Sequence, residues 1–139
     1  MYDFDYVLDV ISPWIDKYID RGPGSLSSRE LIGVAVWMLD VEVNNGGFLQ
    51  YYSNSRGCLA EQTVGALEII GAPDTAALLR AANKEIPFFP LPEDRDDRFA
   101  LLDQVAEQAR FAALETEYYL EREDRIHLLA QYLRATSDT

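Results

Sequence analysis

Apolar residues along most of this chain recur at steps of three and four, which is the spacing of one face of an α-helix. No stretch shows the strict alternation of apolar and polar residues that is typical of a half-buried strand. We therefore expect an all-α fold, a single-domain bundle of about six to seven helices that covers residues 1–139. The pattern predicts helices over about residues 6–19, 28–45, 48–54, 59–70, 73–84, 95–122 and 124–135.

Glycine and proline mark where these helices end. The run RGPGS at residues 21–25 is typical of a loop, and Ser27 or Ser28 is a suitable N-cap for the helix that follows. Pro13 is expected to kink the first helix or to restart it with Ser12 as a cap. Three prolines in PFFPLPED, residues 87–94, exclude a helix and predict an extended crossing segment.

The stretch EVNNGGFLQYYSN, residues 42–54, interrupts the helical pattern with asparagine and glycine. The second helix should stop at Asn45-Gly46-Gly47, since both residue types tolerate the left-handed conformation that ends helices. Phe48, Tyr51 and Tyr52 can then anchor a short returning helix to the core. The other residues of this stretch that form the candidate site are Glu42, Asn44, Asn45, Gly46, Gly47, Gln50 and Asn54.

Glu42 is the least expected member of this corner. It lies four residues after Met38 and eleven after Leu31, which places it near the buried face of its helix. A carboxylate in that position needs hydrogen-bonding partners, and the backbone N–H groups of residues 46–48 are available to it. The corner is then a bonded joint between two helices, a polar pocket for a small molecule or peptide, or a catalytic site with Glu42 as the base.

Charge is the strongest global feature of the chain. Its 12 Lys and Arg residues face 24 Asp and Glu residues, which gives a formal net charge of -12. Such a surface repels phosphates, so direct binding to nucleic acid is disfavoured and a basic protein partner is favoured. The alternative is that the charge serves solubility alone.

The segment predicted as one long helix, residues 95–122, carries an ordered set of acids. At ~100° per residue, five of them fall within about 80° of one another on one helix face: Asp96, Asp103, Glu107, Glu117 and Glu121. A second cluster precedes them: Glu93, Asp94, Asp96 and Asp97. Carboxylates four residues apart are separated by ~6 Å along a helix, close to the spacing of neighbouring phosphates. The inward stripe of the same helix is expected to be Leu102, Val105, Ala109, Ala113, Thr116 and Leu120.

The sequence offers little for other chemistry. It has no P-loop and no G-x-G-x-x-G fingerprint, and its single Cys58 and single His127 cannot build a disulfide, a zinc site or a histidine-based triad. We expect no metal, no cofactor and no enzymatic activity. No apolar run approaches the ~18 residues that a membrane span requires, and the acidic start does not resemble a signal peptide, so a cytoplasmic protein is expected.

Two segments resemble one bacterial family. The motif Glu42-Val43-Asn44-Asn45-Gly46-Gly47-Phe48, continued by Gln50-Tyr51 and Asn54, is similar to the signature of the family that includes the DNA-mimic protein of repressor-antagonist type. The later segment Leu114–Tyr119, in which acidic residues precede a tyrosine pair, is similar to the same family's C-terminal helix. The resemblance implies a helical acidic protein whose surface carboxylates imitate DNA phosphates and occupy the DNA-binding site of a transcription factor. It does not transfer the mimicking acids one by one, because they lie outside the motif.

These observations favour a non-enzymatic binding protein that offers an acidic surface to a basic partner, above all a DNA-binding regulator. The alternative is a regulatory or immunity-type protein with a ligand pocket at residues 42–54. Tyrosines in the C-terminal half, Tyr118, Tyr119 and Tyr132, would also suit a homodimer surface if they are exposed, or a core if they are not.

Overall fold

The computed structural model of the chain describes residues 2–108 and 110–137, with the side chain of residue 108 excepted. In this part it contains seven α-helices, one short 3-10 turn and no strand, which confirms the predicted all-α single-domain bundle. The elements are α1 (Asp3–Arg21), η1 (Pro23–Ser25), α2 (Ser28–Ser55), α3 (Ala60–Ile70), α4 (Pro73–Lys84), α5 (Arg95–Gln108), α6 (Phe111–Tyr119) and α7 (Arg125–Ala135).

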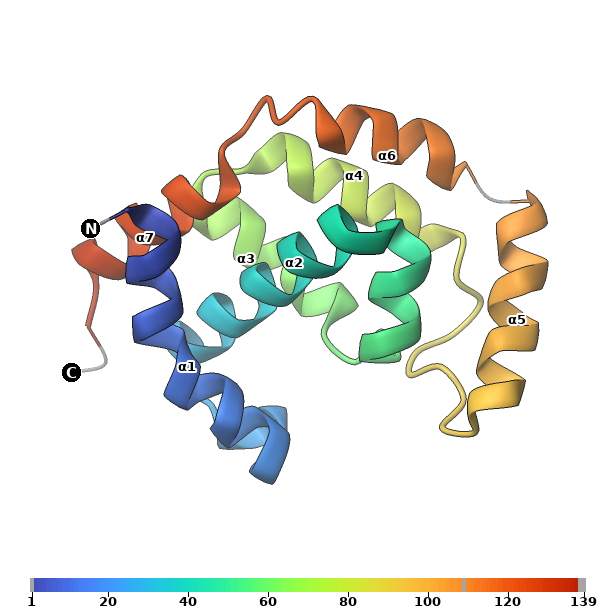
Figure 1. Cartoon of the computed structure of the whole chain (residues 1–139), viewed down its shortest axis with the longest axis horizontal. Helices are drawn as coiled ribbons and strands as arrows, with labels where there is room; N and C mark the ends of the chain where they lie inside the picture. The colour runs from blue at the N-terminus through green and yellow to red at the C-terminus, as the bar shows by residue number, and fades with distance from the viewer. Residues whose placement is uncertain (1, 109, 138–139) are drawn as a thin grey trace.

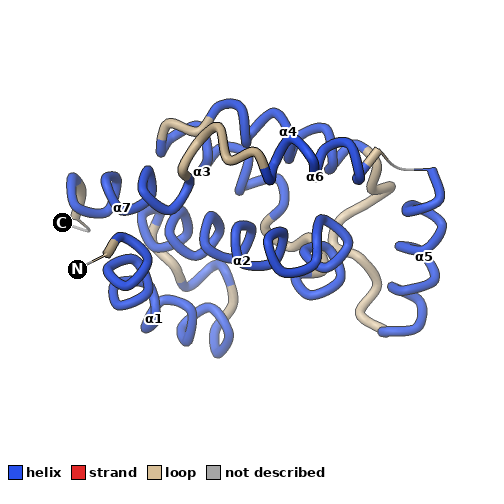
Figure 2. The backbone as a smooth tube through the Cα atoms, turned by 45° about the horizontal axis from the view of Figure 1, so that its top comes forward, coloured by secondary structure: helices blue, strands red, loops and turns tan. Residues whose placement is uncertain are grey.

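The longest helix, α2, runs through the middle of the molecule, and α1, α3, α5, α6 and α7 all pack against it (Figure 1). α1 also packs against α7, and α3 packs against α4. Thus the two ends of the described chain meet, while α5 stands at the opposite end of the long axis (Figures 1 and 2). Side chains that line the core along α2 are fully buried, among them Val36, Leu39, Val43 and Phe48.

Local sequence explains the start of α2 and the course of α1. The Ser27 hydroxyl accepts from the Glu30 N–H, and the Glu30 carboxylate accepts from the Ser27 N–H, so the predicted serine cap is a complete capping box. α1 continues through Pro13 as one helix. Ser12 is therefore not a cap, and its hydroxyl instead donates to the Leu8 carbonyl.

The predicted long helix over residues 95–122 is wrong, since the chain forms α5 and α6 with a break between them. Leu102 and Phe111 are both buried, 4% and 5% exposed. They are nine residues apart, so a continuous helix would place them on opposite sides. The break lets both side chains reach the core.

The expected inward stripe changes with this break. Leu102 is buried and Val105 packs against the core, but Ala113, Thr116 and Leu120 are exposed, and Ala109 lies outside the described residues. The inward residues of α6 are Phe111, Leu114 and Tyr118. Within the described residues, no helix is both long and apolar enough to cross a membrane.

Candidate functional site

The glycine pair of the motif bends α2 sharply. Gly46 has φ -157° and ψ 18°, and Gly47 has φ 77° and ψ -173°, so neither is helical. The backbone angles of Gly47 fall in a region that is essentially restricted to glycine. The predicted stop at Asn45-Gly46-Gly47 is therefore confirmed as a kink, after which α2 resumes and continues to Ser55.

Helix α6 supplies the partners that the kink requires. The Phe48 N–H donates to Glu115 Oε1 at 2.9 Å, and the Tyr119 hydroxyl donates to the Val43 carbonyl at 2.7 Å. A Cβ at Gly47 would collide with the Glu115 carboxylate. In an unbroken helix such backbone groups pair within the helix, and at a break they need partners from outside it. Burial, together with the Glu115 carboxylate, raises the pKa of Tyr119 above its ordinary value.

Glu42 is held within the corner, although not by the groups that the sequence suggested. Its Oε2 accepts from Gln50 Nε2 at 2.9 Å and from Asn54 Nδ2 at 2.7 Å. The Phe48 N–H, one of the backbone partners expected for Glu42, donates to Glu115 instead, because the kink turns that N–H toward α6. Asn44 and Asn45 are exposed, and neither amide takes part in these hydrogen bonds.

The aromatic residues of the motif are the anchors that the sequence predicted. Phe48, Tyr51 and Tyr52 are at most 1% exposed. The Phe48 ring lies 5.9 Å from that of Phe111 and 6.0 Å from that of Tyr118, measured between centroids. The returning half of α2 therefore packs against both ends of α6, and we call this contact the α2–α6 joint.

A buried ion pair next to this joint was missed by the sequence analysis. Arg125 Nε donates to Asp40 Oδ1 at 2.7 Å, and the two side chains are 3% and 13% exposed. The Tyr118 hydroxyl donates to the same oxygen at 2.7 Å, and the guanidinium carbon lies 3.6 Å from the centre of the Tyr118 ring. Burial, followed by the Asp40 carboxylate, raises the pKa of Tyr118 well above its ordinary value. Tyr118 is thus a core residue, which contradicts its use as an exposed dimer contact, whereas Tyr119 is 47% exposed.

A family model described as DMP19-like protein matches residues 24–136. The chain belongs to the DMP19-like family. No curated protein and no solved structure matches it. The matched segment contains the kink, the Glu42 corner and α6, and it begins after the end of α1.

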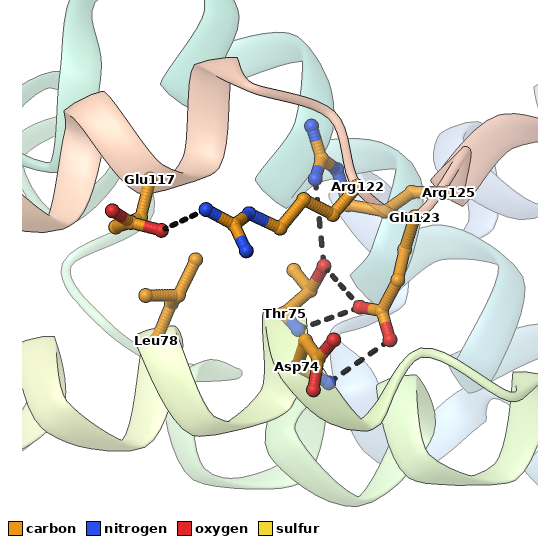
Figure 3. A pocket seen from close by; sticks show the side chains of 7 residues that line it. All are labelled: Asp74, Thr75, Leu78, Glu117, Arg122, Glu123 and Arg125. Atoms are coloured by element: carbon orange, nitrogen blue, oxygen red, sulfur yellow. Dashed lines mark hydrogen bonds and ion pairs between the residues drawn. The ribbon is translucent and has the colours of Figure 1, made fainter.

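Within the DMP19-like segment, a hollow of about 240 Å³ lies between the start of α4 and the connection from α6 to α7 (Figure 3). Glu123 points from that connection onto the first turn of α4. Its carboxylate accepts from the N–H groups of Asp74 at 2.9 Å and Thr75 at 2.6 Å. The negative charge at a helix N-terminus is favourable, so the chain supplies its own anion here. Glu117 forms an exposed ion pair with Arg122 at 3.4 Å across the same hollow (Figure 3).

The structure separates the acids that the sequence placed in one row. Asp96, Asp103 and Glu107 are exposed and share one face of α5. Glu117 lies on α6 and Glu121 follows it, so the predicted five-acid face does not exist. The cluster of Glu93, Asp94, Asp96 and Asp97 is exposed at the start of α5. Asp94 acts there as a cap, and its carboxylate accepts from the Asp97 N–H at 2.9 Å.

A different row of acids, on α1, was missed. Asp5, Asp9, Asp16 and Asp20 are all exposed. At ~100° per residue they fall within about 60° of one another, and at ~1.5 Å per residue the row is about 22 Å long. Among the described residues, none of the four forms an ion pair. The spacing of four, seven and four residues was a sequence signal that could have revealed this α1 row.

Proposed function

We propose that the chain is a non-enzymatic binding protein that presents an acidic surface to a basic protein partner, and that this partner is the DNA-binding surface of a transcription regulator. The α1 row is the observation that carries the proposal. Four carboxylates stand on one exposed helix face, and none of them forms an ion pair with a described residue. Membership of the DMP19-like family is consistent with this function.

The row has the physical properties that a phosphate strand offers to such a regulator. A regulator binds DNA largely through Lys and Arg side chains that neutralise regularly spaced phosphates. Asp5 and Asp9, like Asp16 and Asp20, are separated by about 6 Å along the helix. A rigid helix keeps this spacing without the loss of conformational entropy that a flexible acidic tail would suffer on binding.

The α5 acids are the second candidate surface. Asp96, Asp103 and Glu107 form a shorter row at the other end of the molecule (Figure 1). Arg95 and Arg98 lie on the same helix, and both approach the Phe99 ring. The α5 row has three acids against four on α1, so we place the regulator on α1 and use α5 as the matched control.

The test is a titration of helix-turn-helix regulators from the same genome, with labelled operator DNA as competitor. The wild-type chain should displace the DNA, and its affinity should fall steeply as salt rises. Replacing the α1 row by amides (Asp5→Asn, Asp9→Asn, Asp16→Asn and Asp20→Asn) should abolish displacement.

The matched control removes the same number of charges from α5, by Asp96→Asn, Asp97→Asn, Asp103→Asn and Glu107→Gln. This variant should still compete with DNA. Loss of competition in the α5 variant alone would move the interface to α5. An affinity that does not change with salt, or binding that does not displace the DNA, would contradict the proposal of DNA mimicry.

The Glu42 corner remains a second candidate because its polar groups converge. Glu42 already accepts from Gln50 and Asn54, an arrangement that favours a structural role over ligand binding. Glu42→Gln separates the two roles. It should lower the melting temperature if the corner is a joint, whereas loss of ligand binding in a fully folded variant would support a pocket.

A further inference from the structure

Helices α4 and α6 lie side by side (Figures 1 and 2). A trough with an apolar floor lies between them. Ala77 and Ala81 of α4 and Leu114 of α6 form the floor, and the hollow measures about 440 Å³. The small alanine side chains, four residues apart, leave room for a side chain from another helix to approach. We call this hollow the α4–α6 trough.

The rim of the trough is basic, although the chain as a whole is strongly acidic. Arg80, Lys84 and Arg110 line it, against the single acid Glu85. These are three of the 12 Lys and Arg residues in a chain with 24 acids. Arg80 forms a hydrogen-bonded ion pair with Glu68, whereas Lys84 and Arg110 are exposed and form no ion pair with the described residues. The trough therefore attracts an acidic, partly apolar segment.

The second half of α1 has that chemistry. Asp16 and Asp20 belong to the α1 row, and Ile19 beside them is 71% exposed. Asp16 and Asp20 are four residues apart, as are Arg80 and Lys84, so both pairs are spaced by about 6 Å along their helices. An α1 helix laid along α4 would place the charges in register and Ile19 over the alanine floor.

We propose that α1 of one copy docks in the α4–α6 trough of a second copy. The contact joins two different surfaces, so it is head-to-tail, and a pair of copies keeps one free α1 and one free trough. The surface is small, which makes the contact weak and its occupancy dependent on protein concentration. Assembly grows into short chains, or closes into a ring if the rotation between copies permits.

This contact would also regulate the proposed function, a consequence that rests on the α1 row being the regulator-binding surface. The docked α1 row cannot meet a regulator at the same time. Self-association at high concentration therefore withdraws acidic surface from the regulator, and dilution releases it.

The experiment is sedimentation velocity over a range of concentrations with two charge-reversed variants. The trough variant is Arg80→Glu with Lys84→Glu, and the row variant is Asp16→Lys with Asp20→Lys. The wild-type chain should associate more as its concentration rises. Each variant alone should associate about tenfold more weakly, because like charges then face one another.

An equimolar mixture of the two variants is the decisive sample. The lysines of the row variant meet the glutamates of the trough variant, and the other pairing is the native one, so association should return. The control Asp96→Lys with Asp103→Lys changes the net charge of the chain as much as the row variant does, and it should associate like the wild type. A wild-type chain that stays monomeric, or a mixture that fails to recover, overturns the proposal.

A separate measurement, the amount of regulator bound per chain, tests whether self-association withdraws the α1 row from the regulator. Bound regulator per chain should fall as the wild-type concentration rises, and it should not fall for the trough variant. If no regulator binds at all, the proposed function fails while the sedimentation result still decides whether the copies associate.

Discussion

Two sets of carboxylates, one at the α2–α6 joint and one on α1, are chemically alike and lie in opposite surroundings. At the joint, Asp40 receives hydrogen bonds from Arg125 and Tyr118, and Glu115 receives one from a backbone N–H. On α1, four aspartates face solvent without an ion pair to any described residue. The first set holds helices together, while the second leaves its charge available to a partner.

The two sets of carboxylates also differ in whether the family match covers them. The match begins at residue 24, so it includes the joint and excludes α1. A joint that depends on particular donors at particular positions leaves a sequence motif. A charged helix face needs only a spacing of acids, and it leaves no motif that a family signature would record.

The sharpest way to break the joint is Asp40→Asn. The substitution leaves the Arg125 guanidinium buried without its counter-charge, so the free energy of unfolding should fall by about 3–5 kcal/mol. Urea denaturation measures it. Tyr118→Phe is the control, since it removes one neutral hydrogen-bond donor from the same oxygen and should cost only about 1 kcal/mol. Equal losses in the two variants would show that the ion pair contributes nothing beyond a hydrogen bond.

Gly47→Ala should be nearly as damaging. The backbone angles at this position strain any residue with a Cβ by about 1–3 kcal/mol, and the added methyl group also displaces the Glu115 carboxylate from the Phe48 N–H. We expect a total loss of about 3 kcal/mol in thermal or urea unfolding. Gly65→Ala is the matched control, because Gly65 lies on the exposed face of α3 with nothing within 4 Å of a new Cβ. That substitution should instead stabilise the chain by about 0.5–1 kcal/mol.

How far the sequence predicts the molecule depends on the range of the interaction. Helical periodicity, the Ser27 cap and the break at the glycine pair are local properties, and these predictions are confirmed. The break between α5 and α6 was missed because it follows from burial of two residues, Leu102 and Phe111, against different parts of the core.

Partners far apart in the sequence were equally hidden. Glu115 lies 67 residues from the backbone N–H that it accepts from, and Arg125 lies 85 residues from Asp40. No spacing rule connects such positions, so the Glu42 corner was recognised while the groups that complete the joint were not. The α1 row was a different case, since its spacing of four, seven and four residues is visible in the sequence itself.

A smaller effect is expected where α1 meets α7. The Asp3 carboxylate accepts from Arg134 at 3.0 Å and lies 2.7 Å from His127 Nδ1. The hydrogen bond with His127, and after it the one with Arg134, lowers the pKa of the Asp3 carboxyl. A carboxyl with a lowered pKa in the folded state stabilises the fold above its unfolded pKa, about 3.9, and this contribution is lost as pH falls through the folded value. Unfolding of the wild type should therefore show a small extra loss of stability below about pH 4. Asp3→Asn should lack this component while its remaining pH profile is unchanged.

The smallest expected change in stability, and of opposite sign, comes from neutralising part of the α1 row. Asp16 and Asp20 repel each other at a spacing of four residues, and Asp20 lies in the last turn, where the helix dipole disfavours negative charge. Asp16→Asn with Asp20→Asn should thus raise the free energy of unfolding by about 0.5 kcal/mol. In Asp5→Asn with Asp9→Asn the relief of repulsion is offset by the lost dipole interaction in the first turn, so the net change should be near zero.

A loss of more than about 1 kcal/mol in either pair would exceed what an unpaired surface charge can contribute. It would mean that the row is bonded within the chain, and the contrast with the joint would disappear.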